Sequence, residues 1–332
     1  MICVYGAGSI GCYVGGRLAA AGAEVVFVGR RRFADETAAH GLTLTDLHGA
    51  GLHVPAPRYE TAPEAAAGAR LVLVTVKSAA TAEAAEALAP HLDPGAVVVS
   101  LQNGLRNAAV LRERLPGAAV LAGMCAFNVV HTGEGRFHQG TDGDLGVQDH
   151  PVLDAFAPRF ARAGLPLARE ADLTGVQAAK LLLNLNNAVN ALSGLPLKAE
   201  LSQRDYRRCL ALAQREALAA YKAAGIAPAK TAGLDPRLLP VLLGLPDALF
   251  TRAAAKMLAM DPLARSSTQD DLAAGRATEV DYLNGEIAAL AAEHGLDAPV
   301  NARLTALVHA AEDGGRRDFT GRELLAALRT AA

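Results

Sequence analysis

A glycine-rich turn near the start of the chain limits what this sequence can fold into more than any other feature. The apolar run Met1–Tyr5 leads directly into the turn, and an alanine-rich stretch from Cys12 to Ala21 predicts a helix after it. The turn consists of Gly6, Ala7, Gly8, Ser9, Ile10 and Gly11. Strand, G-x-G-x-x-G and helix in this order are typical of the first βαβ unit of a dinucleotide-binding domain.

Each glycine of the turn has its own predicted role. Gly6 makes the tight turn, Gly8 lets the backbone approach a pyrophosphate, and Gly11 lets the helix pack closely on the strand. The N-terminus of the helix offers backbone N–H groups and a positive dipole end to the phosphates. The alternative, a glycine-rich turn without a ligand, would not require three glycines at this spacing.

The end of the second predicted strand, Glu24–Val28, indicates which dinucleotide binds. A site that prefers NAD usually carries an acidic residue here for the ribose 2′-hydroxyl. This strand is followed by Gly29 and then by Arg30, Arg31 and Arg32, with no carboxylate before Asp35. Because arginine suits a 2′-phosphate, the sequence favours NADP(H) over NAD(H). The alternative is a solvated basic turn.

Two further strands end in polar residues. The buried strand predicted at Leu71–Val76 ends in Lys77, and the strand at Ala96–Ser100 is followed by Asn103. Ligands of open α/β sheets bind beyond the carboxyl ends of the strands. Lys77 and Asn103 are therefore candidates for the nicotinamide-side ribose or the substrate, although their position alone also fits surface groups.

The residue composition of the sequence changes at about Ala171. Valine-rich strands end there, and long segments rich in alanine and leucine follow, at 172–192, 200–224, 236–260 and 278–294. We therefore predict an α/β, Rossmann-type dinucleotide-binding domain over residues 1–168 and an all-α C-terminal domain over residues 169–332.

A stripe of polar residues crosses an otherwise apolar helical segment, 178–192. Lys180, Asn184 and Asn187 are spaced i, i+4 and i+7, which places them on one helix face. Burying an unpaired ammonium or amide costs several kcal/mol, so this face is expected to meet a ligand, a partner or water. Desolvation also lowers the pKa of a lysine and so favours general acid catalysis. Asn186 and Asn190 form a second polar row that this stripe does not explain.

A polar segment near the C-terminus supplies two more candidates. Ser267 offers a hydroxyl for an anionic substrate, and Glu279 offers a carboxylate that could orient the cofactor or the lysine. The structural alternative for this segment is a capping box formed by Thr278 and Asp281.

Composition excludes several other classes of protein. In 332 residues, a net charge of −2 leaves no basic surface of the kind that nucleic acid requires. The four cysteines are scattered without metal-ligand spacing, so no metal site is expected and a reducing, cytoplasmic environment is inferred. The longest apolar stretches are shorter than the roughly 18 residues that a membrane-spanning helix needs. The sequence leaves the oligomeric state open, and a homodimer is compatible with it.

Taken together, these stretches resemble the ketopantoate reductase (2-dehydropantoate 2-reductase) family. The pieces that carry the resemblance are GAGSIG at 6–11, the strand-end Arg30, VTVK ending at Lys77, QNG containing Asn103, KLLLN at 180–184, and SSTQDDLAAGRATEVDYLNG at 266–285. They follow the order of the family over nearly the whole chain, and the last two are the most specific.

The resemblance implies NADPH-dependent reduction of ketopantoate to (R)-pantoate, a step toward pantothenate and coenzyme A. It also implies a Rossmann domain joined to a helical domain, with the active site in the cleft between them. Lys180 becomes the general acid, and Asn103, Asn184 and Ser267 become substrate-binding groups.

On the cofactor side, the resemblance places Lys77, Asn103 and Glu279 near the ribose and nicotinamide end. It places Arg30 near the 2′-phosphate. The position of Arg30 at the strand end independently indicates the same role. The spacing around Glu279 does not decide its role.

Two positions depart from the family pattern. The second asparagine that often follows the lysine by eight residues is replaced by Ala188, and Asn187, on the face of the lysine, is a candidate to serve instead. Ala264 stands where an asparagine that contacts substrate can occur. One competing hypothesis is thus an NADP-dependent reductase of the same two-domain plan that acts on a different 2-oxo acid. Another is a nucleotide-sensing module without enzymatic activity.

Overall fold

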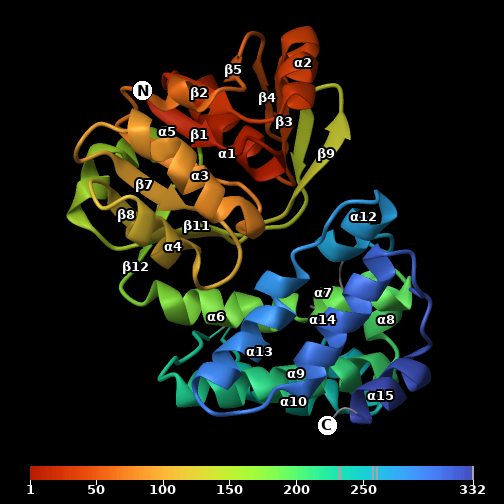
Figure 1. The fold of residues 1–332 in the computed structure, drawn as a ribbon. Helices are drawn as coiled ribbons and strands as arrows, with labels where there is room; N and C mark the ends of the chain where they lie inside the picture. Colours follow the sequence, from red (N-terminus) through yellow and green to blue (C-terminus); the bar gives the residue numbers. More distant parts are fainter. Residues whose placement is uncertain (231–232, 256–257, 259–260, 331–332) are drawn as a thin grey trace. The chain divides into compact units, whose positions relative to one another are not determined.

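Strands dominate the first half of the chain and helices the second. The computed structural model describes residues 1–230, 233–255, 258 and 261–330 (Figure 1). The chain divides into two compact units, Met1–Leu173 and Thr174–Ala332. The first unit is α/β and the second is helical, which confirms the predicted fold class. Residue 168, the predicted domain boundary, lies within the last strand of the first unit, β12.

The first unit is built on a sheet that has eight strands within residues 1–173. In spatial order they are β12 (Leu167–Glu170), β11 (Leu145–Gln148), β8 (Ala119–Cys125), β7 (Val97–Ser100), β6 (Leu71–Val74), β1 (Ile2–Tyr5), β2 (Val25–Val28) and β5 (Arg58–Glu60). Neighbours from β8 to β5 are parallel, and β11 is antiparallel to β8 and parallel to β12. The strand order reverses at β1, with β2 on one side and β6 on the other. Ligands of open α/β sheets bind at such a reversal.

Helices cover both faces of this sheet. Alternate residues of β1 show the two cores: Val4 belongs to one apolar cluster and Cys3 to the other. The first cluster includes residues of α1 (Ser9–Ala20), α2 (Arg31–His40) and α5 (Ala157–Arg162), and the second includes residues of α3 (Thr81–Leu88) and α4 (Asn107–Arg114). Short 3₁₀ helices are η1 (Pro63–Ala66), η2 (Ser78–Ala80), η3 (Ala89–His91) and η4 (Pro151–Ala155). Burial on both faces explains why the strands are continuous apolar runs.

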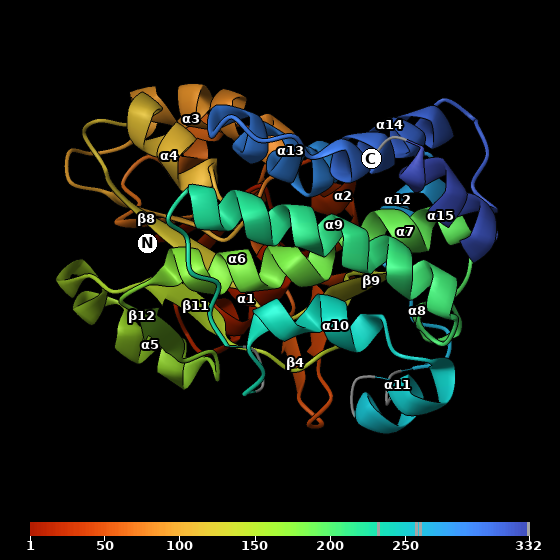
Figure 2. The same ribbon diagram turned by 90° about the horizontal axis from the view of Figure 1, so that it is seen from below.

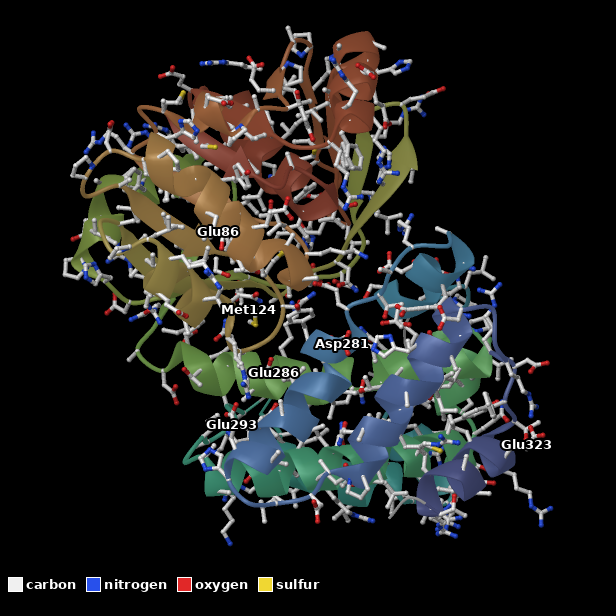
Figure 3. All side chains as sticks on the ribbon, in the orientation of Figure 1. Glu86, Met124, Asp281, Glu286, Glu293 and Glu323 are labelled. Carbon is white, nitrogen blue, oxygen red and sulfur yellow. The ribbon has the colours of Figure 1, made fainter. Side chains whose placement is uncertain are left out.

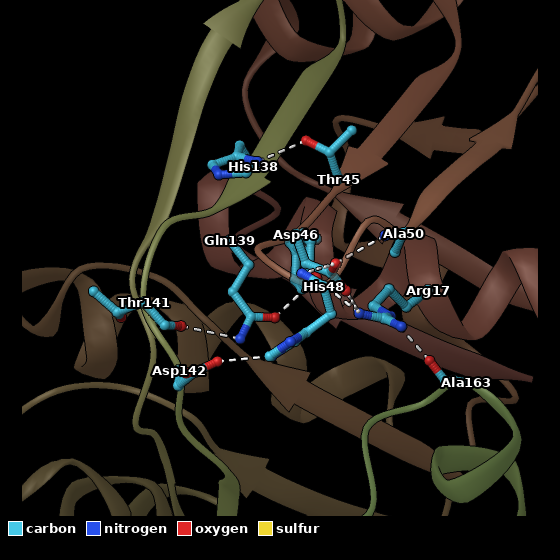
Figure 4. A network of polar contacts seen from close by, with 11 residues as sticks. Arg17, Thr45, Asp46, His48, Ala50, His138, Gln139, Thr141, Asp142 and Ala163 are labelled. Carbon is cyan, nitrogen blue, oxygen red and sulfur yellow. Dashed lines mark hydrogen bonds and ion pairs between the residues drawn. The ribbon is translucent and has the colours of Figure 1, made fainter. Parts of the chain in front are cut away.

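A second, smaller sheet packs against α1. Its strand order is β4 (Gly51–Val54), β3 (Leu42–Thr45), β10 (Arg136–Gln139) and β9 (Val129–Gly133). Arg17 of α1 connects the smaller sheet to the rest of the unit (Figure 4). It donates to Asp46 after β3 at 3.1 Å, to the Tyr13 hydroxyl at 2.8 Å and to the Ala163 carbonyl at 2.9 Å. The Tyr13 hydroxyl in turn donates to Gln139 of β10 at 2.9 Å. This network fixes the helix that begins at the glycine turn.

The second unit is a bundle of helices around α9, which runs beside α6 in Figure 2. Its elements are α6 (Leu173–Asn184), α7 (Asn186–Ser193), α8 (Leu197–Leu201), α9 (Arg204–Ala223), η5 (Pro236–Leu238), α10 (Leu239–Leu243), α11 (Asp247–Ala253), α12 (Ser267–Ala273), η6 (Val280–Tyr282), α13 (Asn284–Glu293), α14 (Pro299–Glu312) and α15 (Gly321–Arg329). No helix in the described ranges is both long enough and apolar enough to cross a membrane.

A buried arginine organises one side of the bundle. Arg207 of α9 is fully buried, lies 4.1 Å from the ring centroid of Phe250, and donates to the carbonyls of Leu201, Leu243 and Leu245 at 2.8–3.2 Å. It also pairs with Asp247 at 2.8 Å. The guanidinium therefore holds the connection between α10 and α11 against α9.

The alanine- and leucine-rich segment 236–260 contains three short helices in its described part, η5, α10 and α11. Pro246 precedes α11 and lacks the N–H that a continuing helix would need. The segment 172–192 forms two helices, and the Leu185 N–H donates to the Leu181 carbonyl at 3.0 Å across the break between them.

Candidate functional site

The surroundings of the three glycines in the turn after β1 differ in whether they leave room for a side chain. Gly6 has a φ of 89°, and a Cβ there would lie 2.4 Å from the backbone nitrogen of Val76. A Cβ on Gly11 would lie 2.6 Å from Thr75 Oγ1. Protein packing therefore demands glycine at both positions. Around Gly8, in contrast, the nearest atom to an added Cβ is 3.9 Å away, so the packing of this unit does not require a glycine there.

The turn leads into a helix start suited to an anion. Gly8 is the N-cap of α1 and provides no side-chain cap, and the first turn of α1 contains no acidic residue. Ser9 and Ile10 follow as half-buried residues of this first turn. Tyr59 of β5 holds the turn from the side, because its hydroxyl donates to the Ala7 carbonyl at 2.6 Å and its ring stacks on Phe27. Burial raises the pKa of Tyr59, so the hydroxyl keeps its proton.

The strand order arranges the candidates of the first unit along one edge of the sheet. Asn103, Lys77, the glycine turn and Arg30 follow β7, β6, β1 and β2, which are adjacent and parallel. Arg30 is the N-cap of α2 and is exposed, as are Arg31 and Arg32. Within the described residues these three arginines have no carboxylate partner among the ion pairs found. The loops that carry Lys77 and Asn103 touch, since Ser78 Oγ donates to the Asn103 carbonyl at 3.2 Å.

In the second unit, Lys180 and Asn184 of the polar stripe lie on the side of α6 opposite to its contact with α9. Two buried side chains of α9 mark that contact, because Tyr221 donates to the Ala178 carbonyl at 3.2 Å and Gln214 to the Leu182 carbonyl at 3.0 Å. Lys180 and Asn184 each follow one of these carbonyls by two residues, about 200° around the helix. Both side chains are half-buried.

The structure brings two of the predicted substrate-binding residues together. Asn187 Nδ2 of α7 lies 3.4 Å from Ser267 Oγ at the start of α12. The neighbouring Asn190, fully buried, accepts a hydrogen bond from the Ser266 N–H at 3.0 Å and donates to the Leu195 carbonyl at 2.9 Å. Asn190 therefore fixes the backbone next to Ser267.

Asn186, the other member of the second polar row, belongs to a buried pair. Its Nδ2 donates to Glu200 Oε2 of α8 at 3.0 Å. Burial raises the pKa of Glu200 to about 8. Asn186 therefore links α7 to α8 and does not face the polar stripe of Lys180, Asn184 and Asn187.

Glu279 precedes η6, in a segment that is hydrogen-bonded to α14. Figure 3 labels Asp281 of η6 and Glu286 of α13. The Thr278 N–H donates to Glu312 Oε1 at 2.7 Å, and His309 lies between Glu312 Oε2 at 2.7 Å and Asp281 Oδ1 at 2.8 Å. These hydrogen bonds raise the pKa of His309. The capping box suggested for Thr278 and Asp281 is not formed in this described segment: Thr278 Oγ1 accepts from the Val280 N–H at 3.3 Å, and residues of α14 bind the Thr278 N–H and Asp281.

The residues that hold the candidates in place carry no clear signal in the sequence. Tyr59 lies in a three-residue strand, and His309 is some 30 residues from the segment it holds. The only signal for Asn190 was a polar residue on an apolar helix, which showed that a partner was needed but not which one.

A doubly wound, mostly parallel sheet with a dinucleotide-type glycine turn at its reversal, joined to a helical unit, is typical of dinucleotide-dependent oxidoreductases. Family models agree: "Ketopantoate reductase PanE/ApbA" matches residues 2–151, and "Ketopantoate reductase PanE/ApbA C terminal" matches residues 172–312. The chain belongs to the ketopantoate reductase family, and it is an oxidoreductase that acts on a CH–OH donor group.

Individual relatives cover nearly the whole chain. The 2-dehydropantoate 2-reductase of Halobacterium salinarum is 30% identical over 322 residues, which are 95% of this chain and 99% of the relative. The crystal structure of a PanE/ApbA family ketopantoate reductase from Ralstonia eutropha JMP134 has a TM-score of 0.82 and 32% identity, covering 95% of this chain and 99% of that one. D-Mandelate dehydrogenase in a ternary structure with NADH and anilino(oxo)acetate shares the fold at 19% identity and a TM-score of 0.78, over 95% and 99% of the two chains.

Proposed function

We propose that this protein reduces 2-dehydropantoate (ketopantoate) to (R)-pantoate with NADPH, as a step toward pantothenate and coenzyme A in the cytoplasm. Hydride transfer to the C2 carbonyl requires a nucleotide, a bound 2-oxo acid and a proton for the developing alkoxide. Family membership supports the reaction type. The order of Asn103, Lys77, the glycine turn and Arg30 along one sheet edge is the observation that supports the cofactor assignment most.

The residues of the first unit fit an NADPH molecule. Gly8 has open space where packing alone would tolerate a side chain, as expected of a backbone that a pyrophosphate must approach. Arg30 is exposed at the strand end where a 2′-phosphate would bind, and it supports NADPH over NADH. Bound NADPH would supply the hydride. Lys77, Asn103 and, from the second unit, Glu279 would orient its ribose and nicotinamide end.

We assign proton transfer to Lys180 of α6. An ammonium that is half-buried on a helix otherwise packed through its apolar face can stabilise an alkoxide and give it a proton. Asn184, one turn further along α6, and the pair Asn187 and Ser267 would bind the carboxylate and hydroxyl groups of the substrate. Asn103 is the substrate-binding candidate from the first unit.

The test is a set of lysine variants assayed with NADPH and ketopantoate. We expect Lys180→Ala to lower kcat by about 10²–10⁴-fold, the usual contribution of a general acid, without changing the dissociation constant of NADPH. Lys180→Arg should not restore activity, because a guanidinium does not release its proton. Lys198→Ala on α8, an exposed lysine of the same unit, is the matched control and should be fully active. Near-normal turnover of Lys180→Ala would refute the assignment.

Ala188 and Ala264 depart from the family pattern on the substrate side, and this keeps open one alternative, reduction of a different 2-oxo acid by the same residues. A panel of 2-oxo acids, assayed with NADPH and with NADH, separates the two. Ketopantoate should give the highest kcat/KM, and NADPH should be preferred. A higher kcat/KM for another 2-oxo acid would move the assignment to that substrate.

A further inference from the structure

A cluster of buried polar side chains lies at the carboxyl ends of β6 and β7, where an apolar core would ordinarily continue. Its members are Ser78, Thr81, Ser100, Gln102 and Asn107, each no more than 7% exposed. None of their side-chain atoms is among the unpaired buried polar atoms found in the described residues. A fully paired network of this kind fixes one arrangement of the backbone around it.

The cluster connects the loop that carries Lys77 to the loop that carries Asn103. A side chain of each loop donates a hydrogen bond to a backbone carbonyl of the other. Gln102, from the loop of Asn103, donates through Nε2 to the Val76 carbonyl at 3.1 Å, next to Lys77. Ser78, from the loop of Lys77, donates to the Asn103 carbonyl at 3.2 Å. Each loop is therefore held by a side chain of the other.

Asn107, the first residue of α4, completes the connection. Its Nδ2 donates to the Asn103 carbonyl at 2.6 Å and to Ser78 Oγ at 3.0 Å, so both of its amide protons serve the junction. Its Oδ1 lies 2.7 Å from the hydroxyl of Thr81, the first residue of α3, which also receives Gln102 Nε2 at 2.7 Å. Ser100 Oγ donates to Gln102 Oε1 at 2.9 Å and fixes the orientation of that amide.

We infer that Asn107, Thr81 and Gln102 are positioning residues that hold Lys77 and Asn103 in the arrangement that binds the nicotinamide end of the cofactor. The inference rests on the proposed function, which assigns Lys77 and Asn103 to the cofactor. The network reaches the main chain within one residue of Lys77 and at Asn103 itself. Gly104 follows with a φ of 87°, a conformation that glycine adopts readily, so the chain turns sharply directly after Asn103.

The central variant is Asn107→Asp, which keeps the shape of the side chain but removes both N–H donors. We expect the dissociation constant of NADPH to rise at least tenfold, measured by titration well below the unfolding temperature. Thr81→Val, which lacks the hydroxyl, should raise it as well, whereas Thr81→Ser, which keeps the hydroxyl, should restore wild-type binding. A loss of thermal stability with unchanged NADPH affinity and kcat/KM in both Asn107→Asp and Thr81→Val would overturn the inference.

A double-mutant cycle separates this inference from the proposed function. Lys77→Met and Asn103→Ala should each weaken NADPH binding. In a protein that carries both substitutions, Asn107→Asp should raise the dissociation constant of NADPH only a little further. If those two variants weaken binding but Asn107→Asp does not, only the positioning role fails. If neither Lys77→Met nor Asn103→Ala affects NADPH binding, the cofactor assignment fails and the positioning role fails with it.

Discussion

Replacement of Gly8 by alanine should separate cofactor binding from folding. Gly8 has a φ of −93° and a ψ of −152°, which alanine can adopt, and its new Cβ would meet nothing closer than 3.9 Å. Two effects of opposite sign act on stability. Fewer unfolded conformations stabilise the alanine variant by about 0.4–1 kcal/mol, and alanine is a poorer N-cap than glycine by a comparable amount. The free energy of unfolding should therefore change by less than about 1 kcal/mol.

The effect on the cofactor should be much larger. A methyl group on Gly8 would occupy the space through which, in the proposed function, a pyrophosphate approaches the backbone. Loss of one hydrogen bond to a charged group costs about 1.5–3 kcal/mol. At about 1.4 kcal/mol for each factor of ten, the dissociation constant of NADPH should rise by roughly 10- to 150-fold.

The assay pairs urea unfolding of the ligand-free protein with titration of NADPH. Gly51→Ala is the matched control, because Gly51 lies in β4 of the same unit and also has nothing within 4 Å of an added Cβ. Both variants should be about as stable as the parent, and only Gly8→Ala should lose affinity. Wild-type NADPH affinity in Gly8→Ala would refute the proposal that a pyrophosphate contacts this turn.

Three other substitutions test the structure around the site. Gly11→Ala should destabilise the protein by about 1–3 kcal/mol in urea unfolding, because its Cβ would lie 2.6 Å from Thr75 Oγ1. Arg207→Met should cost about 3–5 kcal/mol in the same assay, because it leaves three buried carbonyls without their donor. His309→Ala should lose stability in a pH-dependent way, measured by thermal unfolding. The folded pKa of His309 lies above its ordinary 6.5, so its contribution is complete below about pH 6.5 and is lost as pH rises through the folded pKa.

Each of these expectations has a clear contrary outcome. A Gly11→Ala protein as stable as the parent would contradict the close packing of α1 on the sheet. A loss below about 1 kcal/mol in Arg207→Met would mean that the carbonyls find other donors. A difference between wild type and His309→Ala that stays constant from pH 6 to pH 9 would show that the charge of the imidazole does not hold the segment around Glu279.

Short-range patterns in the sequence predicted the framework of the first unit well. Apolar runs marked β1, β2, β6 and β7, and the spacing of Gly6, Gly8 and Gly11 marked the turn, because these features depend on neighbouring residues. The helical nature of the second unit followed from composition for the same reason. Composition did not indicate where the individual helices of this unit begin and end, although Pro246 marks the start of α11.

Residues that hold the site from a distance could not be predicted in the same way. Asn107 sits 26 residues from Thr81 in the chain, and Tyr59 sits 52 residues from the carbonyl of Ala7 to which it donates. Their roles depend on which strands become neighbours, and side-chain type alone does not reveal this. Asn186 and Asn190 show the intermediate case, since the cost of burying an amide indicated that partners exist, and only the fold identified them.

The substitution at position 188 can be interpreted from the same helix. Ala188 is 1% exposed, so the residue at this position faces the interior of the helical unit. Asn187, one residue earlier, is half-buried and its amide lies 3.4 Å from Ser267 Oγ. Asn190 accepts a hydrogen bond from the Ser266 N–H and so fixes the backbone next to Ser267. An asparagine at 188 would add a buried amide, whereas Asn187 supplies one beside a second proposed substrate ligand. If Asn187 binds substrate as proposed, the amide has shifted to the preceding residue and the alanine at 188 removes no substrate contact.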